Sequence, residues 1–213
     1  MEPDAIEIRV VACLVEKQRT TPDVYPLSLN ALRLACNQST NRDPVVSYDE
    51  ATVSDALRRT ALRGWTRLAS GAGSRARKYR HLLDEALGLD GPELSLLAVL
   101  MLRGPQTPGE LKGRSERLHA FADLGAVQGS LELLIEKGYV ARLQRRPGQK
   151  EERYRHTFAT AEEEPAAARP QPGAVPVPEE KLRPAEDRLG RIERELAELR
   201  EQVQALREAL GEG

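Results

Sequence analysis

Aromatic residues are scarce in this chain of 213 residues, where two Phe, five Tyr and one Trp make up 4%. A large β-sandwich is not expected, because aromatic and β-branched side chains normally fill its core. Cysteine is rarer still, and Cys13 and Cys36 are too few for a disulfide scaffold or a structural zinc site. Both lie in apolar helical patterns, so we expect two reduced core residues.

Long apolar runs are also missing. The longest, residues 94–102, is far shorter than the ~20 residues that a membrane-spanning helix needs. A signal peptide is not expected at the start, because Glu2, Asp4 and Glu7 stand where its basic region would be. We therefore expect a soluble, cytoplasmic protein without a membrane contact.

Leu, Ala, Glu and Arg are abundant, which favours helices. The net charge of −1 hides an uneven distribution: residues 1–83 carry +4, residues 84–160 carry 0 and residues 161–213 carry −5. Residues 161–184 are rich in Glu, Ala and Pro, a composition that cannot bury a core and predicts a semi-rigid linker. The folded part is thus expected to end near Thr160.

The first 160 residues contain an internal repeat at an offset of about 74 residues. Matched spacing and an identical tripeptide indicate two copies of one unit. The matching positions are Val53 and Val127, Leu57 and Leu131, Gly64 and Gly138, and Tyr-Arg-His at 79–81 and 154–156.

Each copy has the pattern of three helices followed by a β-hairpin. In the first, Asp4 and Glu7 form a capping box, a second helix begins at Ser28, and a third is predicted to start with a Ser47–Glu50 capping box. The remaining predicted elements are strands over 65–68 and 75–82, helices over 92–103 and 123–137, a helix with a Thr107–Glu110 capping box, and strands over 139–143 and 152–158.

Three helices and a hairpin in this order are the winged-helix plan, a variant of the helix-turn-helix. We therefore predict a mainly α fold with small β-hairpins, of the α+β class. It comprises two tandem winged-helix domains, residues 1–83 and 84–160, and a C-terminal coiled-coil helix over residues 185–213.

Residues 58–80 contain eight basic side chains and no acidic one. They cover the end of the third helix and the hairpin, the elements that a winged helix places on the major groove and the flanking backbone. Helical spacing turns Arg58 and Arg59 outward, and the planar fork of Arg58 suits guanine O6 and N7. The candidate DNA-binding residues are Ser54, Arg58, Arg59, Arg63, Arg67, Arg75, Arg77 and Lys78.

An ordinary solvated face is the alternative, with arginine present for helix propensity and solubility. The second copy differs, because Glu132 and Glu136 on its third helix would repel phosphate. We therefore predict that the first copy dominates contact with nucleic acid. The second packs against it, binds a protein, or contacts the backbone only through Arg145, Arg146 and Lys150.

The C-terminal segment has apolar residues in alternating steps of three and four, the seam of a coiled coil with an open number of strands. We expect self-association through it. The alternative is one amphipathic helix folded back on the rest of the chain, since about three heptads are marginal alone. The seam consists of Leu189, Ile192, Leu196, Leu199, Val203, Leu206 and Leu210.

No enzyme motif is found, so we predict no catalytic residue, metal or cofactor. His81, His119 and His156 are isolated from one another and from both cysteines, and no P-loop or nucleophile motif occurs. The polar segment Asn37–Pro44 has two readings: turn-forming residues at a helix end, or a polar pocket for a partner or a backbone phosphate.

Each copy contains long motifs of its own. The first copy has YPLSLNAL at 25–32, ACNQ at 35–38 and NRDPV at 41–45, and the second has RSERLH at 114–119 and FADL at 121–124. Over roughly residues 5–158 the chain resembles the YceH-like family of bacterial proteins of unknown function. The resemblance implies a bacterial tandem winged-helix protein. It supplies no mechanism and no functional residues.

The leading hypothesis is a non-enzymatic DNA-binding regulator that docks residues 48–63 in a major groove and the hairpin 65–82 on the backbone. The alternative is a protein-interaction scaffold whose winged helices bind proteins and whose C-terminal helix assembles it. Salt-dependent binding to duplex DNA distinguishes the two.

Overall fold

The computed structural model describes residues 2–69, 77–144 and 151–158, all within one compact unit, residues 1–165. The predicted linker (161–184) and coiled-coil helix (185–213) lie outside the described residues. The described helices are α1 (Ala5–Thr20), η1 (Pro22–Val24), α2 (Leu29–Cys36), α3 (Glu50–Leu62), α4 (Leu83–Leu87), α5 (Gly91–Arg103), α6 (Pro108–Ser115) and α7 (Leu124–Glu136); the strands are β1 (Leu27–Ser28), β2 (Thr66–Leu68), β3 (Lys78–His81), β4 (Val140–Leu143) and β5 (Arg153–His156).

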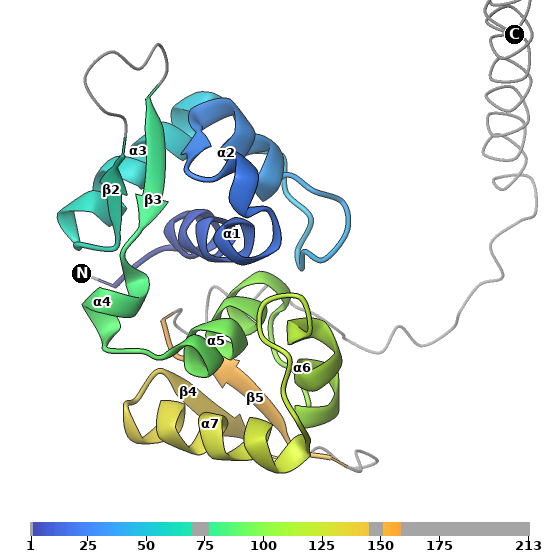
Figure 1. Cartoon of the computed structure of the whole chain (residues 1–213). Helices are drawn as coiled ribbons and strands as arrows, with labels where there is room; N and C mark the ends of the chain where they lie inside the picture. Colours follow the sequence, from blue (N-terminus) through green and yellow to red (C-terminus); the bar gives the residue numbers. More distant parts are fainter. Residues whose placement is uncertain (1, 70–76, 145–150, 159–213) are drawn as a thin grey trace, which may run out of the picture. The chain divides into compact units, whose positions relative to one another are not determined.

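The described residues form a mainly helical α+β fold with small antiparallel sheets, as predicted. The first half, α1 to β3, lies above the second half, α5 to β5, in Figure 1. Both halves have three main helices followed by a two-stranded hairpin, which is the order that the repeat predicts. The predicted boundary near residue 83 falls inside the compact unit, because α1 and α5 pack against each other.

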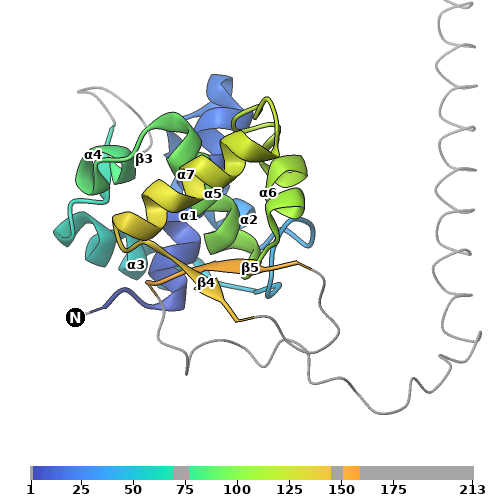
Figure 2. The same cartoon turned by 90° about the horizontal axis from the view of Figure 1, so that it is seen from below.

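Helices α1 and α5 form the centre of the unit. Every residue from 7 to 15 in α1 and from 93 to 102 in α5 is buried, which is expected of helices covered on all sides. Helix α1 packs against α2, α3 and α5, and α5 packs against α6 and α7 as well. Seen from below in Figure 2, α7 lies in front of α5 and α1 lies behind it.

The helix starts are defined by side-chain caps. The predicted capping boxes of Asp4 with Glu7 and of Thr107 with Glu110 are both present. The Ser47–Glu50 box is wrong, because Asp49 caps α3 by accepting a hydrogen bond from the Thr52 amide. The side chain of Asn37 bonds both the N–H and the carbonyl of Tyr48, at 2.8 Å each, and this pairing keeps residue 48 outside the helix.

The first hairpin belongs to a three-stranded sheet of order β1-β3-β2, in which the two-residue strand β1 had no sequence signal. The second hairpin, β4-β5, is two-stranded. Among the described residues, no helix is long and apolar enough to cross a membrane.

Candidate nucleic-acid interface

Three cationic side chains share the outward face of the first hairpin. The antiparallel register pairs Thr66 with His81 and Arg67 with Arg80. Side chains alternate between the two faces of a strand, so Lys78 lies on the same face as Arg80, whereas Thr66 and His81 point inward and are buried. Arg67 and Lys78 are exposed.

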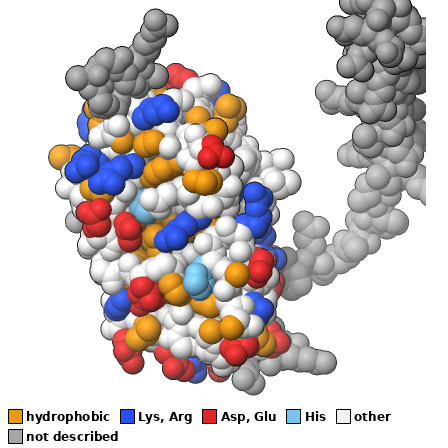
Figure 3. Space-filling model, in the orientation of Figure 1, with side chains coloured by type: hydrophobic (Ala, Val, Ile, Leu, Met, Phe, Trp, Pro, Cys, Tyr) orange, Lys and Arg blue, Asp and Glu red, His pale blue; other side chains and the backbone are white. Residues whose placement is uncertain are grey.

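Like charges directly opposite each other destabilise a strand pair, as Arg67 and Arg80 do here. One carboxylate, that of Glu85, reaches Arg80 at 3.9 Å. The Arg80 Nε atom is buried and has no hydrogen-bond acceptor among the described residues. Figure 3 shows Lys and Arg side chains over the hairpin region in the upper half, whereas Asp and Glu side chains dominate the lower edge. An anion on this face would relieve the repulsion.

The outward face of α3 carries Ser54 and Arg58, both exposed and one helical turn apart. The Arg58 side chain is 75% exposed and its guanidinium pairs with Asp55 on the same helix. An exposed ion pair of this kind contributes little to stability, so Arg58 can exchange this partner for another anion at small cost.

Arg59 lies outside the core, as predicted, but its side chain is only 34% exposed and is already paired. Its guanidinium turns back to the start of α1, where it contacts Asp4 at 2.7 Å and Glu7 at 3.6 Å, and it also pairs with Asp55. A helix periodicity cannot reveal this orientation, because Asp4 lies 55 residues away in the chain.

Arg63 is held by the same acidic cluster at the start of α1. Its Nε donates to Glu7 Oε1 at 2.8 Å, and a terminal nitrogen donates to the Glu2 carbonyl at 2.9 Å. Burial alone would raise the pKa of Glu7, but the hydrogen bonds from Arg63 and the Asp4 amide and the positive charge of Arg59 hold it below its usual value. Arg59 and Arg63 therefore fasten α3 to α1.

The other candidate residues divide into two groups. Arg77 is exposed and directly precedes β3. Arg75, Arg145, Arg146 and Lys150 lie outside the described residues, as do Leu189, Ile192, Leu196, Leu199, Val203, Leu206 and Leu210.

The second half presents a different surface. Glu132 and Glu136 are exposed on α7, as their positions predicted. On its hairpin, Arg142 pairs with Glu152 at 3.4 Å and Arg153 with Glu110 at 3.2 Å. These cations already have carboxylate partners, whereas Arg67 and Lys78 have none among the described residues.

The segment from Asn37 to Asp49 joins α2 to α3 and is longer than the turn of three or four residues in a helix-turn-helix. It is fixed by Arg42, whose side chain is fully buried. The guanidinium donates to both Glu16 oxygens at 2.7 and 3.2 Å, to Gln38 Oε1 at 2.9 Å, and to the carbonyls of residues 35 and 41. All five N–H groups are used, so Arg42 anchors the connection and is not available to a phosphate.

Cys13 and Cys36 are free and buried, which confirms the prediction of reduced core residues. His81 is also a packed residue: its Nε2 lies 2.6 Å from Gln18 Oε1, and burial lowers its pKa to about 4. Among the described residues, no group of three or more His, Cys, Asp or Glu is arranged to hold a metal ion.

The fold and the surface together define this chain as an α+β protein with an arginine-rich hairpin face. Residues 4–149 match the model of the family described as "Protein of unknown function, DUF480". The chain is 47% identical over 203 residues to a UPF0502 protein of Pelobacter propionicus, covering 94% of this chain and 91% of the relative. It is 51% identical over 174 residues to one of Azotobacter vinelandii, covering 81% and 77%.

The chain therefore belongs to the DUF480/UPF0502 family of uncharacterised bacterial proteins. This membership confirms the resemblance to the family of unknown function found from the motifs.

Proposed function

We propose that this protein is a non-enzymatic, duplex-DNA-binding regulator built from two tandem winged helices, and that its first half makes the main contact. The observation that carries the proposal is the outward face of β2 and β3, where Arg67, Lys78 and Arg80 lie together with Arg67 directly opposite Arg80. A phosphate backbone is the ligand that such a face suits, because Lys and Arg supply most phosphate contacts in protein–DNA complexes.

In this arrangement helix α3 is the element that reads the DNA sequence. Ser54 and Arg58 lie on its exposed side, and the side chains of Arg59 and Arg63 hold its inner side on α1. The anchored segment 37–49 fixes the start of the helix. A recognition helix held at both ends keeps its exposed side chains in one orientation, which favours a bidentate contact between Arg58 and guanine.

The second half contributes less because Glu132 and Glu136 are exposed on α7 and would repel phosphate. Self-association through the seam from Leu189 to Leu210 would bring two first halves together on DNA. Two half-sites, spaced by the geometry of the pair, would then be bound by one assembly.

Fluorescence anisotropy with a labelled duplex at 50 mM salt tests the proposal. The R67Q/K78Q variant is expected to bind at least tenfold more weakly than the wild type, because two phosphate contacts are lost. The matched control, K112Q/R142Q, removes the same charge from the second half and is expected to bind like the wild type. Equal affinity of all three proteins, or no binding by any, would favour a protein-interaction scaffold.

A further inference from the structure

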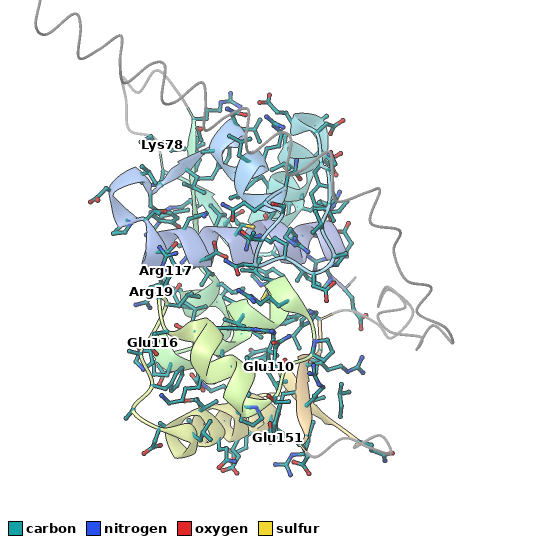
Figure 4. The ribbon with its side chains drawn as sticks, turned by 90° about the vertical axis from the view of Figure 1, so that its right-hand side faces the viewer. Arg19, Lys78, Glu110, Glu116, Arg117 and Glu151 are labelled. Atoms are coloured by element: carbon teal, nitrogen blue, oxygen red, sulfur yellow. The ribbon has the colours of Figure 1, made fainter. Side chains whose placement is uncertain are left out.

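An open groove of about 410 Å³ lies where the two halves meet. Its walls come from the last turns of α1 and α5, from the end of α6 and from the segment around Thr40. Figure 4 shows this junction, with Arg117 and Arg19 at the level where α1 lies above α6. The volume is in the range of small-molecule sites, which span about 300–1,000 Å³.

Half of the residues that line the groove are cations or threonines. Lys17, Arg103, Arg114 and Arg117 line it, and the one carboxylate of the described lining, Glu16, pairs with Lys17 at 3.3 Å and with both terminal nitrogens of buried Arg42. Thr20 and Thr21 add hydroxyl groups that donate to helix carbonyls and keep their oxygen lone pairs free to accept. No aromatic ring of the described residues lines it.

Basic residues in the last turn of a helix are common, because they balance the helix dipole. That balance does not account for this groove. Three helix ends contribute about half an elementary charge each, which is less than the charge of the four cations. The Glu110 carboxylate, 3.6 Å from Arg114, is shared with Arg153. Positive charge therefore remains in excess.

Two of the cations lack a carboxylate partner in the part of the chain that the structure describes. Arg117 is exposed and has no hydrogen bond or ion pair with the described residues. Arg103 contacts the side-chain oxygen of Asn41, a residue in the left-handed region at φ 62°, and has no carboxylate partner among the described residues. Partial burial, followed by the nearby charges of Arg114 and Arg42, lowers the pKa of Arg103 below its usual value.

We propose that this junction groove binds a small, multiply charged phosphorylated molecule that bridges the two halves. The cations converge on a concave space from both halves, which suits a compact anion better than the rod of a duplex. The absence of an aromatic ring from the lining indicates recognition of phosphate and hydroxyl groups and not of a base. This site is separate from the hairpin face proposed for DNA.

Thermal unfolding of the full chain with pyrophosphate tests the groove, with sodium chloride of equal ionic strength as the reference. Once pyrophosphate exceeds about five times its Kd, Tm is expected to rise by about 2–4 °C. The R103Q/R117Q variant should lose this rise. The R67Q/K78Q variant removes the same charge from the hairpin and should keep it.

The single variant R117Q controls for unfolding, because a substitution at exposed Arg117 should leave the fold intact. It should weaken pyrophosphate binding several-fold, as measured by calorimetry. No rise in the wild type, or an equal rise in R103Q/R117Q, would overturn the proposal. So would a loss of duplex binding in R103Q/R117Q without any pyrophosphate binding, because the groove would then be part of the DNA surface. Pyrophosphate binding without duplex binding would support the groove and contradict only the proposed function.

Discussion

The guanidinium of Arg42 and the carboxylate of Glu16 form two parallel hydrogen bonds, of 2.7 and 3.2 Å, that fasten the connection between α2 and α3 to α1. Arg42 is completely buried and the Glu16 side chain is 13% exposed. Glu16 lines the junction groove, and Arg42 belongs to the segment that leads into α3. Its integrity therefore bears on both proposed surfaces.

Replacing Arg42 by Met is expected to lower the free energy of unfolding by about 3–5 kcal/mol, because five hydrogen bonds lose their buried donor and Glu16 keeps only Lys17, at 3.3 Å, as a counter-ion. Urea denaturation measures the loss. The double variant R42M/E16M should recover part of it, since the Glu16 carboxylate that needs the Arg42 guanidinium is then also removed. R58M, at an exposed position, should change the free energy of unfolding by about 0.5 kcal/mol or less. A loss in R42M no larger than in R58M would contradict the anchor.

The stability of the protein should fall as the solution becomes acidic, in part because of His81. Its pKa is about 4 in the folded protein, against 6.5 in the unfolded chain. Between these values the unfolded chain binds a proton that the folded protein does not, so stability falls as pH drops below 6.5. From pH 7 to pH 4.5 the contribution is about 2–3 kcal/mol.

The variant H81Q removes this titration. Its loss of unfolding free energy between pH 7 and pH 4.5, measured by urea denaturation, should be smaller than that of the wild type by the same amount. Equal losses in the two proteins would show that His81 does not stay neutral in the fold.

The two halves are expected to respond differently to single substitutions in their third helices. R58A should weaken binding to a duplex about fivefold or more, because one guanidinium contact is removed. E132A should leave affinity unchanged or raise it slightly, because a repelling carboxylate is removed. Anisotropy titrations at one salt concentration compare them, and equal losses would contradict the dominance of the first half.

The seam from Leu189 to Leu210 is predicted to hold chains together. Analytical ultracentrifugation should find an oligomer for the full chain and a monomer for residues 1–160. The variant V203D, which puts a charge at the centre of the seam, should dissociate the full chain. A monomeric full-length protein would contradict self-association through this seam.

Local signals in the sequence predicted much of the fold. The capping boxes at Asp4 and Thr107 and the repeat of three helices and a hairpin are short-range patterns, and the structure contains them. Ser47 and Asp49 are both good caps, and the choice between them depends on Asn37, which binds Tyr48 from eleven positions away.

The candidate site was harder to predict from the sequence, because ion pairs between residues far apart in the chain decide which arginines stay exposed and unpaired. Arg59 and Arg63 belong to the same basic run in the sequence as Arg58, but in the structure Asp4 and Glu7 bind them to α1. Arg80 lies on the hairpin face but stood outside the predicted set. Only the strand register, which pairs it with Arg67, reveals its position.

The salt dependence of duplex binding tests the central claim most directly. With about four phosphate contacts, log affinity should fall with log salt at a slope of roughly −4 for the wild type, and at roughly −2 for R67Q/K78Q. A wild-type protein that binds no duplex at 50 mM salt, or a variant with an unchanged slope, would contradict the assignment of the hairpin face to DNA.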